Sequence, residues 1–436
     1  MEDREDVDLP GLVMDPDYES DSADSEDEGK SGYRKGGYHP VCVGERYHNR
    51  YTIEKKLGWG HFSTVWLASD SEVPDDHPHK LVALKIQKSA SQYVDAAMDE
   101  IELLSMIRKK KENCDTVGAN CVVELLNHFV VYGVNGKHIC LVFETMGPNL
   151  LSLIKRYDYQ GVPLRMVKVI TKQILEGLHF LHTQAGIIHT DLKPENFLLA
   201  PLKKFDLAKV QENRRRICAE RRKAEIAKLA SFSLQLDSKV KAAKNEETSA
   251  AVRSICEAAD VKTKEKRKSV TPRKICLGTK IADLGNACWI HKHFTDDVTT
   301  RQYRSPEVIV GYPYGTPIDV WSLACLVFEL LTGDYLFDPK ADANHKHTRN
   351  EDHLALMMEL IGQMPPILTQ EGKHSRKLFN SKGKLRNIRE LDTWALRQVF
   401  NLPSLVSPFF CSYELVRCWQ TNTKWKVNFL SNSQAF

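Results

Sequence analysis

The chain has 436 residues and a formal net charge of +4, so its length suits two compact lobes with appendages and its charge balance does not indicate nucleic-acid binding. Its eleven cysteines are scattered without a Cys-x-x-Cys pair, which favours reduced thiols in the cytosol or nucleus over a disulfide framework. The charged N-terminus and the lack of a long apolar run predict a soluble intracellular protein with neither a membrane partner nor a direct nucleic-acid partner.

Residues 1–45 are rich in acids and poor in apolar side chains, so we predict a disordered acidic tail. Ser20, Ser22 and Ser25 lie among these acids. Phosphorylation by an acid-directed kinase therefore stays open beside a purely solvated role for the tail.

A glycine pair lies between two strand-like runs near the start of the ordered region. Gly58 and Gly60 let the backbone approach a phosphate chain closely, which favours a nucleotide-binding loop. Ser63 stands where such loops often have a third glycine, so the pair is weak evidence by itself. Leu57, Ser63 and Val65 complete the nucleotide-binding residues expected here, with Val65 on the adenine.

The next strand, residues 81–86, is apolar apart from Lys85 and includes Ala83, a further expected nucleotide contact. An unpaired charge in such a strand costs several kcal/mol, about the scale of burying a polar group without a partner. Glu100, in the helical stretch 95–107, is its natural partner. The alternative is a lysine whose ammonium group reaches solvent.

Residues 140–147 form another apolar strand that ends in a glycine and resembles the hinge of protein kinases. The resemblance implies that backbone groups near Glu144 and Met146 bind adenine and that Phe143 closes the pocket behind it.

Residues 188–196 combine three chemical groups after a helix that we expect to end at Gly186. Asp191 can accept a proton from a hydroxyl, Lys193 can neutralise a phosphate oxygen, and Asn196 supplies an oxygen ligand for Mg²⁺. This stretch resembles the catalytic loop of protein kinases, with Thr where the family usually has Arg. A chance surface loop is the alternative.

The segment 202–275 is rich in Lys, Arg, Glu and Ala, and we predict a disordered basic spacer that leaves the lobe and returns to it. Residues 206–229 could form a charged helix. The basic cluster 264–274 is either a nuclear-import signal or, more simply, a solvated run of charge.

The pattern resumes at residues 279–286, where an apolar run ends in Asp283-Leu-Gly and resembles the metal-binding turn of kinases. Residues 299–307 resemble the substrate-positioning end of a kinase activation segment. A helix that is apolar almost all round follows at 318–331, and it begins with Asp319, an N-cap or a support of the catalytic loop.

The residues at 189–191, 283–289, 300–305 and 348–353 together resemble the SR-protein kinase family, over about residues 40–200 and 275–399. This resemblance implies an α+β, bilobal protein-kinase fold, with a small antiparallel β lobe at 46–147 and a helical lobe at 148–201 and 276–399. It also implies a monomeric, ATP- and Mg²⁺-dependent Ser/Thr kinase, cytoplasmic and nuclear, that phosphorylates Arg-Ser-rich splicing factors.

An acidic set follows the buried helix: Asp334, Glu351, Asp352 and Glu359. The resemblance matches three of these acids, Asp334, Asp352 and Glu359, to a substrate-docking groove. Asp352 and Glu359 are seven residues apart, hence on one helix face, where carboxylates can bind arginines by charge-assisted bonds. A solvated acidic face is the alternative.

The resemblance stops after about Val399, and residues 400–436 form an atypical tail where relatives have further helices that close the lobe. One alternative function is therefore a weakly active or inactive kinase-like binding protein that keeps the docking groove. Another is a kinase of the same broad group with other substrates.

Overall fold

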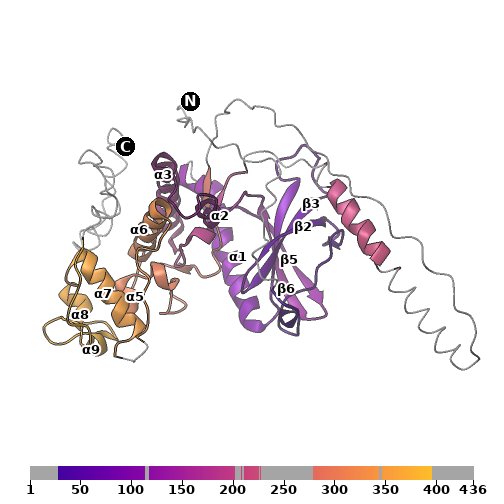
Figure 1. Ribbon diagram of the computed structural model, residues 1–436. Coiled ribbons are helices and arrows are strands. Elements are labelled where there is room, and N and C mark those ends of the chain that lie inside the picture. Colours follow the sequence, from indigo (N-terminus) through magenta and orange to yellow (C-terminus); the bar gives the residue numbers. More distant parts are fainter. Residues whose placement is uncertain are drawn as a thin grey trace, which may run out of the picture.

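The computed structural model describes residues 28–112, 117–201, 208, 211–224, 226, 278–342 and 346–394. These residues form two lobes, one built around a sheet and the other around helices (Figure 1). The predictions for residues 1–27, for most of the spacer and for the atypical tail at 400–436 lie outside the described residues. None of the described helices is long and apolar enough to cross a membrane.

A six-stranded antiparallel sheet forms the first lobe, with its strands in the order β1-β2-β3-β4-β6-β5. The strands are β1 (Arg46–Tyr47), β2 (Tyr51–Trp59), β3 (Ser63–Asp70), β4 (Leu81–Gln87), β5 (Leu125–Gly133) and β6 (Gly136–Glu144). The helices of this lobe are η2 (Lys30–Gly32), α1 (Ser91–Glu112) and η3 (Val117–Cys121).

Two hydrophobic cores lie on the two faces of this sheet. Ile139 and Leu141 of β6 belong to the core that contains α1, whereas Cys140 and Val142 belong to a core formed by the sheet strands. This alternation follows from the period of two along a strand, and it explains why the central strands read as continuous apolar runs. The first core continues into the helical lobe through α3 and α6 and so connects the lobes.

The second lobe contains most of the described helices and two pairs of short strands, β7 with β10 and β8 with β9, on either side of residues 188–196. The helices are α2 (Leu150–Arg156), α3 (Leu164–Phe180), η4 (Leu181–Ala185), η5 (Pro194–Asn196), η6 (Arg301–Tyr303), α5 (Pro306–Val310), α6 (Pro317–Thr332), α7 (Arg349–Ile361), α8 (Pro366–Gln370) and α9 (Ser375–Leu378). The strands are β7 (Ile187–Ile188), β8 (Phe197–Leu199), β9 (Thr279–Ile281) and β10 (Cys288–Trp289). As predicted, the helix before the catalytic loop ends at Gly186, which has a φ of 70°.

The spacer leaves and re-enters the helical lobe at one point. β8 pairs with β9 in antiparallel register, Leu199 lies opposite Thr279, and the Ala200 N–H donates to the Gly278 carbonyl over 2.6 Å. The two parts of the lobe are therefore joined as if no insert separated them, and the predicted α+β bilobal fold is confirmed.

Two predicted segments differ from the structure. Residues 28–45, placed in the acidic tail, pack on the sheet lobe, where Tyr38 and His39 are buried. Residues 211–224, placed in the disordered spacer, form a helix that lies beside the sheet lobe (Figure 1), within the stretch 206–229 for which a charged helix was the alternative. Its Arg214 bonds the buried Glu54 carboxylate over 2.7 Å, which supplies a physical reason for the helix to lie there.

Candidate active site

The nucleotide-binding loop is the turn between β2 and β3. Gly58 lies opposite Val65 in the hairpin, and the Gly60 N–H donates to the Ser63 carbonyl over 2.9 Å. A Cβ atom placed at Gly58 or Gly60 would meet nothing within 4 Å, so the loop backbone faces open space. Leu57 and Val65, on the two strands, are half-buried beside it. This open space allows a phosphate chain to approach the loop backbone closely.

Lys85 joins three elements at the centre of the site. Its ammonium nitrogen lies 2.9 and 3.0 Å from the two Glu100 oxygens and 2.9 Å from Asp283 Oδ1. Burial acts to lower the pKa of Lys85, but the Asp283 and Glu100 carboxylates outweigh it and raise this pKa. The side chain therefore stays charged and paired. This is the predicted pairing with Glu100, and not the alternative in which the ammonium group reaches solvent.

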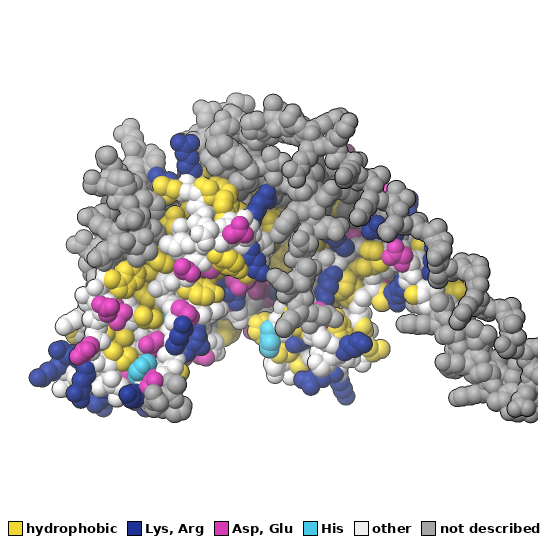
Figure 2. All heavy atoms as spheres, in the orientation of Figure 1, with side chains coloured by type: hydrophobic (Ala, Val, Ile, Leu, Met, Phe, Trp, Pro, Cys, Tyr) yellow, Lys and Arg dark blue, Asp and Glu magenta, His cyan; other side chains and the backbone are white. Residues whose placement is uncertain are grey.

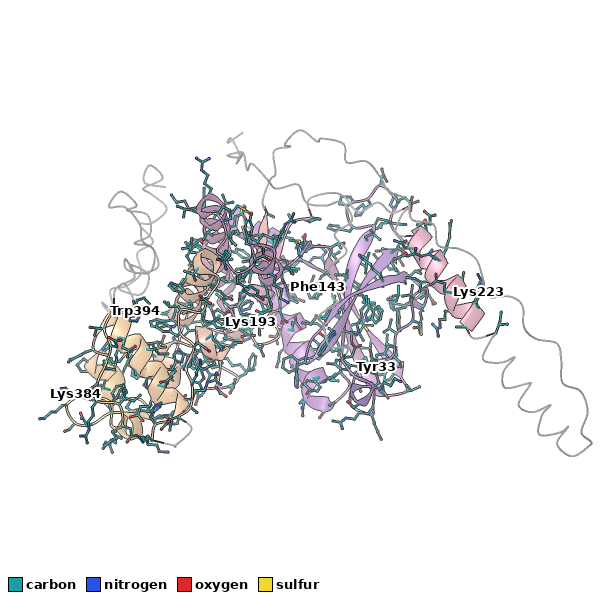
Figure 3. All side chains as sticks on the ribbon, in the orientation of Figure 1. Tyr33, Phe143, Lys193, Lys223, Lys384 and Trp394 are labelled. Carbon is teal, nitrogen blue, oxygen red and sulfur yellow. The ribbon has the colours of Figure 1, made fainter. Side chains whose placement is uncertain are left out.

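The hinge follows β6 and lies where the two lobes meet. Phe143 lies opposite Ala83 in the sheet register, and Figure 3 shows Phe143 between the sheet lobe and the helical lobe. Met146, three residues on, is half-buried. The sheet register therefore places the predicted adenine contacts Ala83 and Phe143 next to each other on β4 and β6.

Glu144 uses its side chain to hold the hinge to the second lobe. Its two carboxylate oxygens accept hydrogen bonds from Lys280 Nζ over 2.6 and 2.8 Å, and its N–H donates to the Glu124 carbonyl over 3.2 Å. A contact of Glu144 with adenine would therefore use its backbone carbonyl. Sequence reasoning missed Lys280, because its partner lies 136 residues away.

Asp319 of α6 binds the backbone of the catalytic loop through its carboxylate. Its carboxylate accepts hydrogen bonds from the N–H groups of His189 (2.8 Å) and Thr190 (2.9 Å), and it lies 2.8 Å from His182 Nε2. Thr190 has a φ of 67°, a backbone conformation that is strained for a β-branched residue. The buried carboxylate offsets this strain by satisfying the two N–H groups that the bend exposes.

Asp191 lies at the end of this loop, surrounded by donors. Its Oδ2 accepts from Lys193 Nζ over 2.9 Å and from Asn286 Nδ2 over 3.3 Å, and its Oδ1 accepts from the Thr300 hydroxyl over 2.7 Å. Burial acts to raise the pKa of Asp191, but the Lys193 ammonium outweighs it and holds this pKa below its usual value. The carboxylate is thus ionised and oriented at neutral pH. Lys193 lies near the junction of the lobes (Figure 3).

The pairing of β8 with β9 brings the two predicted metal ligands into one region. The Ala282 N–H donates to the Asn196 carbonyl over 2.8 Å, so that Asp283 follows directly beside the catalytic loop. Asn196 Nδ2 donates to the Asp191 carbonyl over 2.8 Å, which leaves Asn196 Oδ1 as the atom for a cation. Asp283 is 43% exposed, and the Lys85 ammonium holds the pKa of its carboxyl below the usual value.

An amide oxygen and one ionised carboxylate suit a hard divalent cation that also binds phosphate oxygens. No cluster of three or more His, Cys, Asp or Glu side chains able to hold a metal occurs among the described residues. The donor set therefore fits a metal that arrives with a nucleotide and not one held by the protein alone.

Two residues of the site were not predicted as contacts of Asp191. Asn286 and Thr300 both bond its carboxylate, and they come from the segment that re-enters after the spacer. Both lie inside motifs that sequence reasoning used only for other roles. Their polar side chains, next to Asp283 and the substrate-positioning segment, were the available signal.

The three predicted docking acids lie on the helical lobe, two of them on α7. Asp352, in the first turn of α7, accepts from the Lys340 N–H over 2.8 Å, and Glu359, two turns on, accepts from the Asp392 N–H over 3.1 Å. Asp334 lies in the exposed turn after α6. In Figure 2, acidic side chains are interspersed with basic ones over this lobe.

A neighbouring acid, Glu351, differs from these three. Its carboxylate is buried and accepts from the N–H and the side-chain amide of Asn387 over 2.7 and 2.8 Å. It therefore stabilises the lobe from inside and does not present a charge to a substrate.

Comparison with known proteins gives a consistent result. The model of the protein kinase domain matches residues 51–219 and 264–381. The Serine/threonine-protein kinase SRPK of Physarum polycephalum is 50% identical over 380 residues, which is 87% of this chain and 83% of that protein. Protein kinase dsk1 of Schizosaccharomyces pombe is 37% identical (93% and 84% covered), and human SRSF protein kinase 3 is 35% identical (87% and 84% covered).

Proposed function

Because the chain belongs to the SR-protein kinase family of Ser/Thr protein kinases, we propose that it phosphorylates serines in Arg-Ser-rich splicing factors. The family uses ATP and a divalent metal, and we propose Mg²⁺ as that metal because the expected ligands are an amide and a carboxylate oxygen. We further propose that the protein acts as a monomer in cytoplasm and nucleus.

The residues of the site divide the work of phosphoryl transfer. Lys85, held by Glu100, orients the phosphates of ATP, and the backbone of the glycine loop covers them. Asp191 accepts the proton of the serine hydroxyl as the serine oxygen bonds the γ-phosphorus and the bond from that phosphorus to the β,γ-bridging oxygen breaks, leaving ADP. Lys193 neutralises charge on the transferring group. Mg²⁺, held by Asn196 and Asp283, would neutralise charge on the phosphate oxygens.

The observation that favours an arginine-rich substrate is the pair of acids on α7. Asp352 and Glu359 each use one carboxylate oxygen in a bond to a backbone N–H. Those bonds fix the side chains, while each carboxylate has a second oxygen for a guanidinium group. Pre-organised carboxylates of this kind bind arginine better than lysine, because the guanidinium fork can form two parallel bonds.

The test compares an Arg-Ser repeat peptide with a Lys-Ser peptide of equal length and charge. We expect a lower KM for the Arg-Ser peptide, and a KM that rises with salt because the docking contacts are partly exposed. Asp352→Asn and Glu359→Gln should raise the KM for the Arg-Ser peptide while leaving kcat within about twofold, since docking is separate from the transfer step. Glu371→Gln, at an exposed acid after α8, serves as the control. Equal KM values for the two peptides would refute the proposed substrate class.

A further inference from the structure

Residues 28–44, here called the N-terminal strap, run over the sheet lobe and reach the nucleotide-binding loop. The Gly36 N–H donates to the Asn135 carbonyl over 3.0 Å, and the Asn135 side chain donates back to the Tyr38 carbonyl over 2.6 Å. The Ser89 N–H donates to the Gly37 carbonyl over 3.1 Å. The strap is thus tied to the β5–β6 turn and to the link between β4 and α1. Figure 3 shows Tyr33 of the strap at the edge of this lobe.

The turn that leads into Tyr38 requires glycine. Gly36 has a φ of 82°, a conformation that side chains disfavour, and a Cβ on Gly37 would lie 2.1 Å from the Gly32 carbonyl oxygen. This tight turn directs the Tyr38 ring into the lobe, where it is 3% exposed. The Lys88 ammonium lies 4.3 Å from the centre of that ring, a cation–π contact that adds to its fixation.

The Tyr38 hydroxyl reaches the nucleotide-binding loop and donates to the Gly60 carbonyl over 2.7 Å. Burial raises the pKa of Tyr38, so the hydroxyl remains a donor at neutral pH. The other arm of the loop is held separately, because the Lys88 N–H donates to the Phe62 carbonyl over 2.9 Å. The loop is therefore fixed at two carbonyls. The Gly60 carbonyl also accepts from the Ser63 N–H within the hairpin, but over 3.3 Å, so the shorter bond to it comes from the Tyr38 side chain.

The direction of one carbonyl decides the direction of the next N–H. In a planar trans peptide, the C=O of one residue and the N–H of the following residue point in opposite directions. Fixing the Gly60 carbonyl toward Tyr38 consequently aims the His61 N–H away from the strap. In loops of this kind, backbone N–H groups bind the phosphates of the nucleotide.

We propose that Tyr38 is a positioning residue of the ATP site, which holds the Gly60–His61 peptide so that the His61 N–H faces the phosphates. The inference rests on the kinase activity of the family and is independent of the Arg-Ser substrates. It makes the strap part of the nucleotide site, although the strap precedes the kinase-domain match, which begins at residue 51.

The test is Tyr38→Phe, which keeps the ring and its contact with Lys88 and removes the hydroxyl. We expect the Kd for ATP, measured in the presence of Mg²⁺, to rise about three- to tenfold, the scale of one lost hydrogen bond. The Kd for adenosine should stay within about twofold, because adenosine binds the hinge and has no phosphates. Steady-state kinetics should show the same rise in the KM for ATP and an unchanged KM for the peptide.

Tyr132→Phe, at an exposed tyrosine on β5, is the matched control and should leave both Kd values unchanged. An unchanged Kd for ATP in Tyr38→Phe would overturn the proposal. So would equal losses for ATP and adenosine, which would show that the hydroxyl supports the lobe in general and not the phosphate contact. Neither result depends on which peptide the kinase phosphorylates.

Discussion

The ammonium nitrogen of Lys85 lies 2.9 Å from Oδ1 of Asp283, so the strand lysine of one lobe directly contacts the expected metal ligand of the other. Lys85→Met removes this contact and the cation that orients the phosphates. We expect kcat/KM to fall by about 10²–10³-fold, the scale of one pre-organised electrostatic group. Steady-state phosphorylation of an Arg-Ser peptide measures it.

The same substitution leaves Glu100 buried without its cation, so a stability change must be separated from a catalytic one. Lys85→Met should lower the free energy of unfolding by about 3–5 kcal/mol, as expected when one partner of a buried pair is removed. The double variant Lys85→Met/Glu100→Gln should recover most of that stability and none of the activity. Recovery of activity in the double variant would show that Lys85 acts only on stability.

Asp319→Ala should destabilise the protein through the catalytic loop. The substitution leaves the buried N–H groups of His189 and Thr190 without their acceptor, at about 1–3 kcal/mol each. Asp319→Asn keeps one carbonyl oxygen, so its effect should be intermediate. Urea unfolding midpoints measure both. Equal effects of Ala and Asn would contradict an account in which each carboxylate oxygen satisfies one N–H.

Glu329 makes the helical lobe sensitive to pH. Burial raises the pKa of Glu329 from its ordinary value of 4.5 to about 7, with the Tyr303 hydroxyl 2.5 Å from its Oε2. Between these two pH values the native state holds a proton that the unfolded chain has released. Stability therefore falls as pH rises from 4.5 to about 7, by about 3 kcal/mol.

Glu329→Gln removes the titrating group and keeps an oxygen that can accept from Tyr303. Unfolding measured at pH 5, 6, 7 and 8 should show that the variant loses less stability than the wild-type protein over the lower part of this range. Above pH 7 the difference should stay constant. Parallel curves from pH 5 to 7 would mean that Glu329 ionises in the native protein as it does in the unfolded chain.

The site residues that could be predicted from the sequence are those that lie in short local motifs. Lys85, Asp191, Asn196 and Asp283 each stand in a local pattern whose spacing fixes their side chains, and the structure places them in one region. The motifs on both sides of the long insert could be predicted as well, because the strands that flank it, β8 and β9, have their own apolar patterns and pair directly.

The parts that were not predicted depend on contacts between distant segments. Glu54 and Arg214 are 160 residues apart, and neither has a local signal for the other. The strap was assigned to the acidic tail because the acids of the first thirty residues dominated the composition. Its aromatic residues, Tyr38 and His39, are the signal that would have separated it.

In the proposed reaction, Asp191 accepts the serine proton beside an ATP held by Lys85. Asp191→Asn keeps the size and polarity of the side chain, so ATP and an Arg-Ser peptide should bind within about twofold of their wild-type affinities. The most direct measurement is a single-turnover reaction of this variant with saturating ATP, metal and pre-bound peptide. With both ligands bound, we expect the phosphorylation rate of the variant to be at least about 10²-fold lower than that of the wild-type protein. Equal rates would show that Asp191 is not the proton acceptor.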